Sequence, residues 1–262
     1  MTFGIIGSGA FGTALSISLS STNKKLILWT RNQDVVNSVQ EIRENRLRLP
    51  GYILPQNIIV TNDINQMENC SIILIAVPMQ QLRSVVELHR SRLEGKILVA
   101  CCKGFEVSTG LGPTSILEMA SNKTAVLTGP SFAADLASGF PTALTVASKV
   151  EGLAQYIQSE LGTETLRLYW SDDPIGAEFG GALKNVIAIG CGVTIGAGYG
   201  SSSRAALMTR GYSEIISIAP YFGAKPETLS GLSGLGDLSL TCMSSESRNC
   251  LLYTSPSPRD QL

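Results

Sequence analysis

The chain has 262 residues, enough for one large domain or two smaller ones, and its 44% hydrophobic content excludes a disordered protein. Its formal net charge of −1 gives no overall basic field that would attract nucleic acid or an anionic membrane. The N-terminus has no basic region before an apolar stretch, so we expect no signal peptide and a cytoplasmic protein. The cysteines do not form a recognisable disulfide framework, and we expect reduced thiols without a metal.

A glycine-rich turn near the N-terminus is the first motif. Apolar residues 3–6 predict a buried strand, and residues 7–12 (GSGAFG) fit the pattern G-x-G-x-x-G before a predicted helix. In a dinucleotide site Gly7 permits the tight turn, Gly9 lets a pyrophosphate approach the backbone, and Gly12 lets the helix pack on the strand. The phosphates would lie at the helix N-terminus, where free N–H groups favour negative charge. A glycine-rich turn without a ligand is the alternative.

A second strand is predicted at residues 25–30. A NAD-selective fold usually places an acidic residue at the end of this strand, about 20 residues beyond the glycine motif. Arg31 occupies that place here, and its guanidinium suits the 2′-phosphate of NADP or stacks on adenine. We therefore expect NADP to be accepted, with an ordinary surface arginine as the alternative.

Further strands are predicted at residues 58–61, 71–77, 96–101, 125–128, 142–147 and 166–170. Lys103 and Gly129 follow two of these strands, at the carboxyl edge where open α/β sheets bind ligands. The alternation of strands and helices predicts an α/β fold with a doubly wound parallel sheet.

The pattern changes near residue 174, where we place the end of the first domain. The following segments are helical and rich in Gly and Ala. Residues 179–197 are nearly all apolar apart from Lys184 and Asn185, which favours a buried helix over a membrane span. A lysine inside such a helix is rare unless it is paired or used.

The polar residues available for proton chemistry are few. His89, the single histidine, lies in a polar stretch that predicts a solvated helix end, so an acid or base would be Lys, Asp, Glu, Tyr or Cys. Asp237 lies among small and apolar neighbours, with Thr241 one helical turn on. Arg248 lies between two hydrogen-bonding side chains and suits an anionic group such as phosphate. On spacing alone, a helix cap and a surface arginine are the alternatives for Asp237 and Arg248.

Six blocks of sequence, in the same order, resemble the bacterial NAD(P)-dependent sn-glycerol-3-phosphate dehydrogenase family. They are residues 7–13 (GSGAFGT), 103–106 (KGFE), 129–133 (GPSFA), 181–186 (GALKNV), 234–238 (GLGDL) and 247–249 (SRN). The resemblance implies a Rossmann-like domain at residues 1–174 that binds NADP or NAD, then a partial, mostly helical substrate domain at residues 175–249. Residues 250–262, with their Ser-Pro repeats, do not resemble the family's continuation and predict a disordered tail of other origin.

The resemblance also implies a reaction, the reversible hydride transfer between dihydroxyacetone phosphate and sn-glycerol 3-phosphate, which supplies a backbone for phospholipid synthesis. It implies that Lys184 accepts the proton in the oxidative direction, with Asp237 beside it. The positions implied for this small phosphorylated substrate are Lys103, Gly129, Ser131, Lys184, Asp237, Thr241, Ser247, Arg248 and Asn249. The positions expected at the cofactor are the motif glycines Gly7, Gly9 and Gly12, together with Ala10, Phe11, Arg31, Lys103, Ala133 and Arg248.

Two other functions stay open. One is a dehydrogenase of the same architecture that acts on another phosphorylated hydroxy compound, because Lys103 and Arg248 favour a phosphate but do not fix a carbon skeleton. The other is a nucleotide-binding protein without turnover. The sequence also leaves open the oligomeric state, for which a homodimer is one candidate, and the net direction of the reaction.

Overall fold

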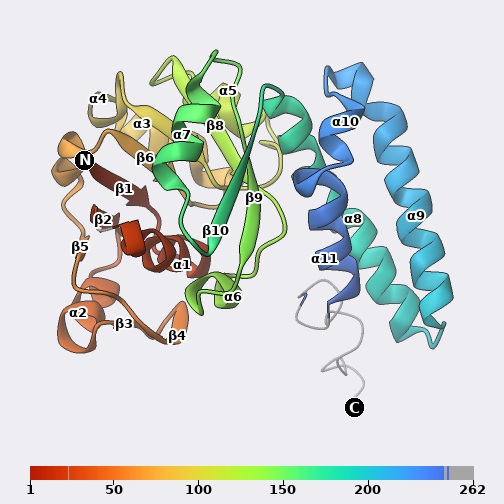
Figure 1. The fold of residues 1–262 in the computed structure, drawn as a ribbon, viewed down its shortest axis with the longest axis horizontal. Helices are drawn as coiled ribbons and strands as arrows, with labels where there is room; N and C mark the ends of the chain where they lie inside the picture. The colour runs from red at the N-terminus through yellow and green to blue at the C-terminus, as the bar shows by residue number, and fades with distance from the viewer. Residues whose placement is uncertain (23, 245–246, 248–262) are drawn as a thin grey trace.

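An eight-stranded sheet with helices on both faces forms the N-terminal part of the chain, up to Ser171 (Figure 1). In this computed structural model, residues 1–22, 24–244 and 247 are described. The strands lie in the order β10-β9-β8-β7-β6-β1-β2-β5. Their bounds are β1 Thr2–Ile6, β2 Lys25–Trp29, β5 Ile58–Thr61, β6 Ile72–Ile75, β7 Ile97–Ala100, β8 Lys123–Thr128, β9 Thr142–Ala147 and β10 Leu166–Ser171.

Six of these strands, from β5 to β8 in sheet order, are parallel to one another, as the sequence predicts. The prediction is wrong for the last two, because β9 pairs with β8 in the antiparallel sense and β10 runs parallel to β9. The connection from β8 to β9 contains the short helix α6 (Ala133–Ala137), which packs on α1 (Ala10–Leu19). The chain therefore re-enters the sheet from the edge at which it left, and runs back.

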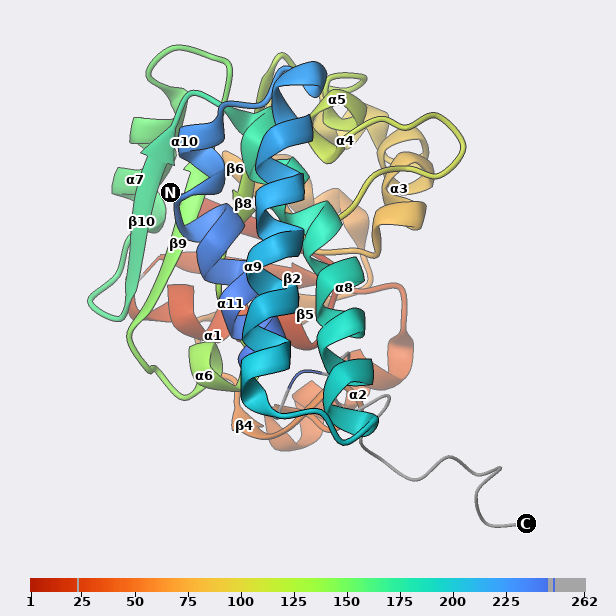
Figure 2. The ribbon, with the colours of Figure 1, turned by 90° about the vertical axis from the view of Figure 1, so that its right-hand side faces the viewer.

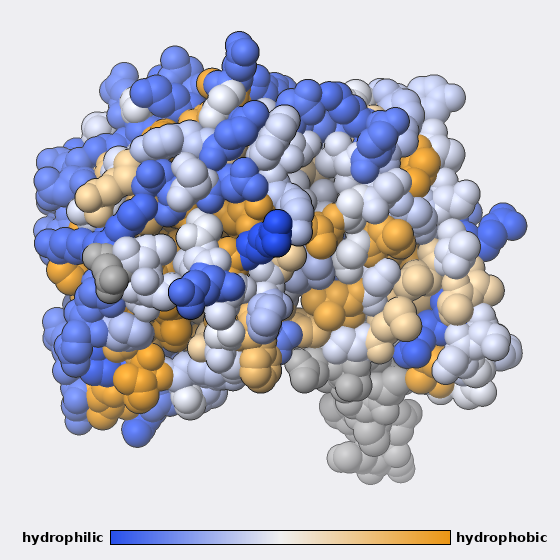
Figure 3. All heavy atoms as spheres, in the orientation of Figure 1, coloured by the Kyte–Doolittle hydropathy of each residue, from blue (hydrophilic) through white to orange (hydrophobic). Residues whose placement is uncertain are grey.

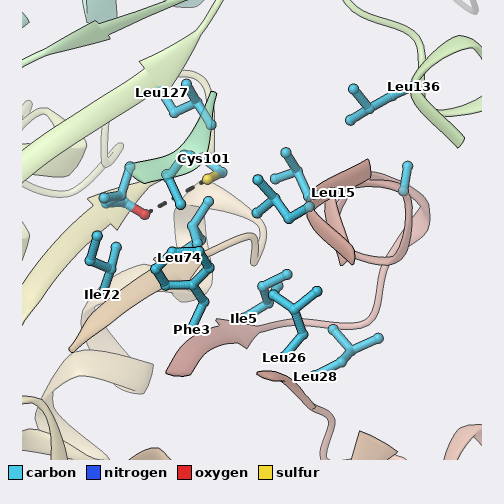
Figure 4. Close-up of a cluster of buried hydrophobic side chains, with 14 of the residues drawn as sticks. Phe3, Ile5, Leu15, Leu26, Leu28, Ile72, Leu74, Cys101, Leu127 and Leu136 are labelled. Atoms are coloured by element: carbon cyan, nitrogen blue, oxygen red, sulfur yellow. Dashed lines mark hydrogen bonds between the residues drawn. The ribbon is translucent and has the colours of Figure 1, made fainter. Parts of the chain in front are cut away.

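Two apolar layers cover the sheet and make it doubly wound. In β1, Phe3 and Ile5 point into one cluster, which includes Leu15 of α1, while Ile6 points into the other cluster with Leu82 (Figure 4). The first layer also holds α2 (Gln33–Ile42) and α7 (Leu153–Leu161), and the second holds α3 (Leu82–Leu88), α4 (Arg90–Leu93) and α5 (Pro113–Leu117). Burial on both faces accounts for the nearly continuous apolar runs of the central strands.

The described residues from Pro174 onward are helical. Their elements are α8 (Pro174–Gly196), α9 (Ser201–Ile218), α10 (Pro226–Leu229), the π-helical turn η5 (Leu232–Gly236) and α11 (Asp237–Met243). Figure 2 shows α8, α9 and α11 side by side. Asp173 caps α8 by accepting a hydrogen bond from the Gly176 amide at 2.8 Å, and this cap lies beside the predicted domain boundary at residue 174, which stays a prediction.

Helix α8 is only partly buried, which corrects the expectation of a buried helix. Its side toward the sheet, η5 and α11 is enclosed, whereas Val186, Ile189 and Val193 are 67%, 36% and 43% exposed. Among the described residues α8 is the single helix with the length and composition of a membrane span, a test that core helices of soluble proteins also pass. Its polar centre, Lys184, is buried and bonds protein partners, as described below.

A small hairpin is the element that sequence patterns do not reveal. It consists of β3 (Glu44–Asn45) and β4 (Leu49–Ile53), paired antiparallel, and β4 contacts both α1 and α6. The strands are too short to produce an alternating pattern, and Pro50 and Gly51 lie within the second one.

The remaining turns are short and helical. They are η1 (Ser20–Thr22), η2 (Ile64–Asn69), η3 (Met79–Gln81) and η4 (Ala219–Phe222).

His89 lies at the end of α3, as expected, but it is half-buried, with its ring edge-on to Trp29 at 5.2 Å between centroids. Burial lowers the pKa of His89, so it is a packing group and not a solvated one.

Candidate active site

The glycine turn has the geometry that a dinucleotide requires. Gly7 has φ +111°, and a Cβ there would lie 2.6 Å from the Ala76 carbonyl oxygen. A Cβ on Gly12 would lie 2.0 Å from the Gly7 carbonyl oxygen, so this glycine permits close packing of α1. A Cβ on Gly9 would meet nothing within 4 Å, so the space beside it is open. A pyrophosphate fits that space, next to the first turn of α1.

The strand order brings other predicted residues to the same edge. From β1 the chain winds outward through β2 and β5 on one side and through β6, β7 and β8 on the other, which makes the glycine turn the switch point of the sheet. Arg31 is exposed just beyond β2, and Lys103 and Gly129 follow β7 and β8. The Ser8 hydroxyl donates to Thr30 Oγ1 at 2.7 Å and joins the turn to the end of β2.

Two lysines share one buried carboxylate at this edge. Lys184 of α8 donates to Asp237 Oδ1 at 2.6 Å and to Thr241 Oγ1 at 2.9 Å. Lys103 donates to the other oxygen, Asp237 Oδ2, at 2.6 Å and to the Gly129 carbonyl at 3.1 Å. We refer to Lys103, Lys184, Asp237 and Thr241 as the lysine–aspartate cluster. It assembles residues that the sequence places far apart.

The net shift in the pKa of Lys184, which the sequence leaves open, is downward. Burial removes solvent from the ammonium and the neighbouring Lys103 repels it; these effects outweigh attraction by Asp237 and lower the pKa to about 8. Lys184 is 8% exposed and Asp237 1% exposed. Two cations against one carboxylate leave the cluster with positive charge, which favours an anionic ligand or a developing oxyanion.

Small residues allow the helices to approach closely enough to form this cluster. A Cβ on Gly180 of α8 would lie 2.5 Å from the Ser233 carbonyl oxygen of η5. A Cβ on Gly234 would lie 2.0 Å from the Leu229 carbonyl oxygen. The π-helical turn η5 runs directly into α11 and so places Asp237 opposite Lys184. Irregular turns of this kind often occur at functional sites.

The other predicted site residues fall into two groups. Ala10 and Phe11 open α1, and Ser131 and Ala133 lie at the start of α6; all four are half-buried. Ser247 is buried. Arg248 and Asn249 lie outside the described residues. Which of these side chains touch substrate or cofactor stays a prediction.

The loop that carries Lys103 is held by side chains that sequence reasoning missed. Arg83 of α3 forms two hydrogen bonds with Glu106, at 2.8 and 2.7 Å, and this contact lowers the pKa of Glu106 to about 2. At the far end of the loop, Glu178 of α8 accepts the Thr114 amide at 2.7 Å. Burial raises the pKa of Glu178 to about 7. Glu106 lies in a loop and Glu178 bonds a backbone amide, so neither contact leaves a periodic signal in the sequence.

The buried cysteines of the described residues are unsuited to act as nucleophiles. Within the described part of the chain, Cys70, Cys101, Cys102, Cys191 and Cys242 are all buried. Burial raises the pKa of Cys70 to about 11 and that of Cys102 to about 12, so their thiolates are scarce at neutral pH.

A groove of about 530 Å³ lies elsewhere, between the sheet and the helical half. It is lined from β9, β10, α10 and η5, with Trp170, Lys225 and Leu232 among its residues, and not by the lysine–aspartate cluster. On the face drawn in Figure 3, hydrophobic and hydrophilic residues are mixed in this part of the molecule.

Comparison with known families assigns this architecture. Residues 2–154 match the family described as NAD-dependent glycerol-3-phosphate dehydrogenase N-terminus, and residues 173–252 match the corresponding C-terminus. The chain belongs to the NAD-dependent glycerol-3-phosphate dehydrogenase family.

Individual members of the glycerol-3-phosphate dehydrogenase family are similar over nearly the whole chain. A protein named glycerol-3-phosphate dehydrogenase [NAD(P)+] from Ruegeria sp. is 52% identical over 95% of this chain and 78% of its own length. Its counterpart from Roseobacter denitrificans is 51% identical with the same coverage. The crystal structure of glycerol-3-phosphate dehydrogenase from Coxiella burnetii matches with a TM-score of 0.91 and 32% identity, over 99% of this chain and 82% of that one.

Proposed function

We propose that this chain interconverts sn-glycerol 3-phosphate and dihydroxyacetone phosphate with NAD or NADP. The observation that carries the proposal is the lysine–aspartate cluster, which lies at the same sheet edge as the glycine turn. The chain is 52% identical to a protein named for this activity, which distinguishes the proposal from other dehydrogenases of the same architecture.

The turn around Gly9 and the first turn of α1 would hold the pyrophosphate of the dinucleotide, with Arg31 beside its adenosine half. When bound, the nicotinamide supplies or accepts a hydride. Arg31 lies where a 2′-phosphate would be read, which supports use of NADP besides NAD. Lys103, Ala133 and Arg248 are the further cofactor contacts in this proposal.

Lys184 is the proton donor and acceptor in this account. In the reductive direction its ammonium protonates the carbonyl oxygen of dihydroxyacetone phosphate while the carbonyl carbon gains the hydride. In the oxidative direction neutral Lys184 takes the hydroxyl proton. With its pKa near 8, both forms are populated close to neutral pH. Asp237 orients the ammonium, and Lys103 adds positive charge for the developing oxyanion.

The substrate phosphate is assigned from the sequence. Arg248 and Asn249, with Ser247 before them, have the donors that a phosphate dianion requires. Gly129 and Ser131 lie at the edge that Lys103 faces, since Lys103 bonds the Gly129 carbonyl. These residues complete the proposed substrate site.

We extend the proposal to the setting of the reaction. It would supply glycerol 3-phosphate for phospholipid synthesis in the cytoplasm, without membrane insertion and without a nucleic acid partner. The enclosed ion pair of Lys184, in the middle of α8, supports a helix packed against protein.

The exposed apolar stripe of Val186, Ile189 and Val193 supports a homodimer.

The test is a comparison of substrates on the purified chain. We expect oxidation of NADH or NADPH with dihydroxyacetone phosphate, and a far smaller rate with dihydroxyacetone, which lacks the phosphate. Equal rates with another phosphorylated ketone would favour the related dehydrogenase. Tight cofactor binding without any oxidation of NADH or NADPH would favour the nucleotide-binding protein without turnover.

A further inference from the structure

The hairpin β3–β4 inserts a buried amide beneath the glycine turn. Asn45 is completely buried, and its Nδ2 donates to the Ser8 carbonyl oxygen at 2.9 Å and to Thr13 Oγ1 at 2.8 Å. Thr13, also fully buried, donates its hydroxyl to the same Ser8 carbonyl at 3.3 Å. One carbonyl in the turn is thus fixed by two side chains, one of them from an element outside the βαβ unit.

Fixing this carbonyl also fixes the next amide. The peptide bond between Ser8 and Gly9 is trans and planar, so the Ser8 carbonyl and the Gly9 N–H point in opposite directions. Because the carbonyl points inward to Asn45, the N–H of Gly9 points outward. A Cβ on Gly9 would meet nothing within 4 Å, so open space also lies beside its Cα, and we expect the pyrophosphate there.

The hairpin is itself firmly attached. Arg43, the residue before it, has a left-handed backbone (φ 56°) and donates its guanidinium to the carbonyls of Leu54 and Ile58 at 3.1 and 3.0 Å. Tyr52 of β4 meets Ser138, just after α6, at 3.2 Å between their hydroxyls. These contacts hold the hairpin, and with it the Asn45 side chain, in a fixed position relative to the glycine turn.

We propose that Asn45 is a positioning residue for the dinucleotide, because it holds the Ser8 carbonyl inward and so directs the Gly9 amide at the pyrophosphate. This inference rests on the cofactor part of the proposed function. Asn45 itself does not contact the cofactor in this account. Removing the Asn45 side-chain amide would let the Ser8–Gly9 peptide plane rotate.

The test measures equilibrium binding and not only activity. We expect Asn45→Ala to weaken NADH binding, followed by NADH fluorescence, by about 10-fold, the size of one lost hydrogen bond. ADP-ribose, which keeps the pyrophosphate and lacks the nicotinamide, should lose as much, whereas adenosine should lose little. Asn45→Asp should be worse, because a carboxylate would face the Ser8 carbonyl. The rate at saturating NADH and dihydroxyacetone phosphate should stay within about threefold.

Asn37→Asp is the matched control, since Asn37 is an exposed asparagine of the neighbouring helix that bonds only Gln33 among the contacts described. It should leave NADH and ADP-ribose affinity unchanged. If Asn45→Ala does not fold, Thr13→Val removes the second donor to the Ser8 carbonyl while keeping the side-chain shape, and it should show the same selective loss.

Three results would overturn the proposal. A folded Asn45→Ala chain that binds NADH and ADP-ribose as tightly as the parent excludes positioning. An equal loss of adenosine affinity indicates a general structural defect. If the parent chain binds no NADH, both the proposed cofactor and this inference are wrong. If the parent binds NADH but does not reduce dihydroxyacetone phosphate, only the proposed reaction is wrong.

Discussion

The glycine turn and the lysine–aspartate cluster meet at one sheet edge but are built in opposite ways. The turn is six consecutive residues and offers backbone groups and open space. The cluster joins side chains 53 and 134 positions apart in the chain and offers charge. A bulkier side chain should therefore disrupt the glycine turn, whereas loss of a charged or proton-donating group should disrupt the lysine–aspartate cluster. Separate variants can test each region while the other is measured as a control.

The largest expected effect is on cofactor binding. Gly9→Val should abolish it, because the side chain would fill the space left for the pyrophosphate. The fold should survive, since no neighbour lies within 4 Å of a Cβ at Gly9. Gly12→Ala is the contrasting variant, and it should destabilise the fold because its Cβ would lie 2.0 Å from the Gly7 carbonyl oxygen. A folded Gly9→Val chain with unchanged NADH affinity would refute this reading of the turn.

The next largest effect is on turnover. Lys184→Met keeps most of the side-chain bulk and should lower kcat and kcat/KM by about 10²–10⁴, the usual share of a general acid–base. NADH affinity should be retained, because the turn does not depend on Lys184. A folded variant that turns over within a few-fold of the parent would exclude Lys184 as the proton donor.

A smaller effect separates the two cofactors. Arg31→Asp should weaken NADPH more than NADH, by about 1–3 kcal/mol, because an anion replaces the cation beside the 2′-phosphate. The measurement is the ratio of the two dissociation constants. Equal losses would show that Arg31 stacks on adenine and does not recognise the phosphate.

The smallest effect concerns the support of the Lys103 loop. The pKa of Glu178 is raised to about 7, so the folded chain keeps it neutral at acid pH and loses stability as the pH rises toward 7 and its buried carboxyl ionises. Glu178→Gln keeps an oxygen for the Thr114 amide and cannot ionise. Its Tm should equal that of the parent near pH 5 and exceed it by roughly 2–4 °C near pH 8.5, the shift that about 1 kcal/mol gives to a chain of this size. A constant difference between the two chains at all pH values would contradict the assignment.

Much of the fold and of the site could be predicted from the sequence, for different reasons in the two regions. The strands of the sheet were predictable because their buried runs are continuous, and the roles of Gly7, Gly9 and Gly12 because the motif is local. The reversed direction of β9 was not, because strand sense depends on where α6 packs and not on the residues of the strand.

The cluster was predictable only in part. A lysine in an apolar helix indicated that Lys184 is paired or used, and family resemblance indicated Asp237. Lys103 bonds the second oxygen of the same carboxylate because η5 packs closely against α8. The spacing of residues in the sequence does not reveal this packing. Asn45 was missed because β3 has two residues and no pattern, although its amide supports the most recognisable motif in the chain.

The most direct test of the central claim is the pH dependence of a single turnover. The rate of NADH oxidation by saturating dihydroxyacetone phosphate would be followed in one turnover from about pH 6 to about pH 10, for the parent and for Lys184→Met. Because the ammonium form of Lys184 donates the proton, the account predicts a rate that is high at low pH and falls as the pH rises through about 8, with the opposite trend for oxidation of sn-glycerol 3-phosphate. The Met variant should show a low rate without this transition. A parent rate that does not change across the range, or the same transition in both chains, would contradict the account.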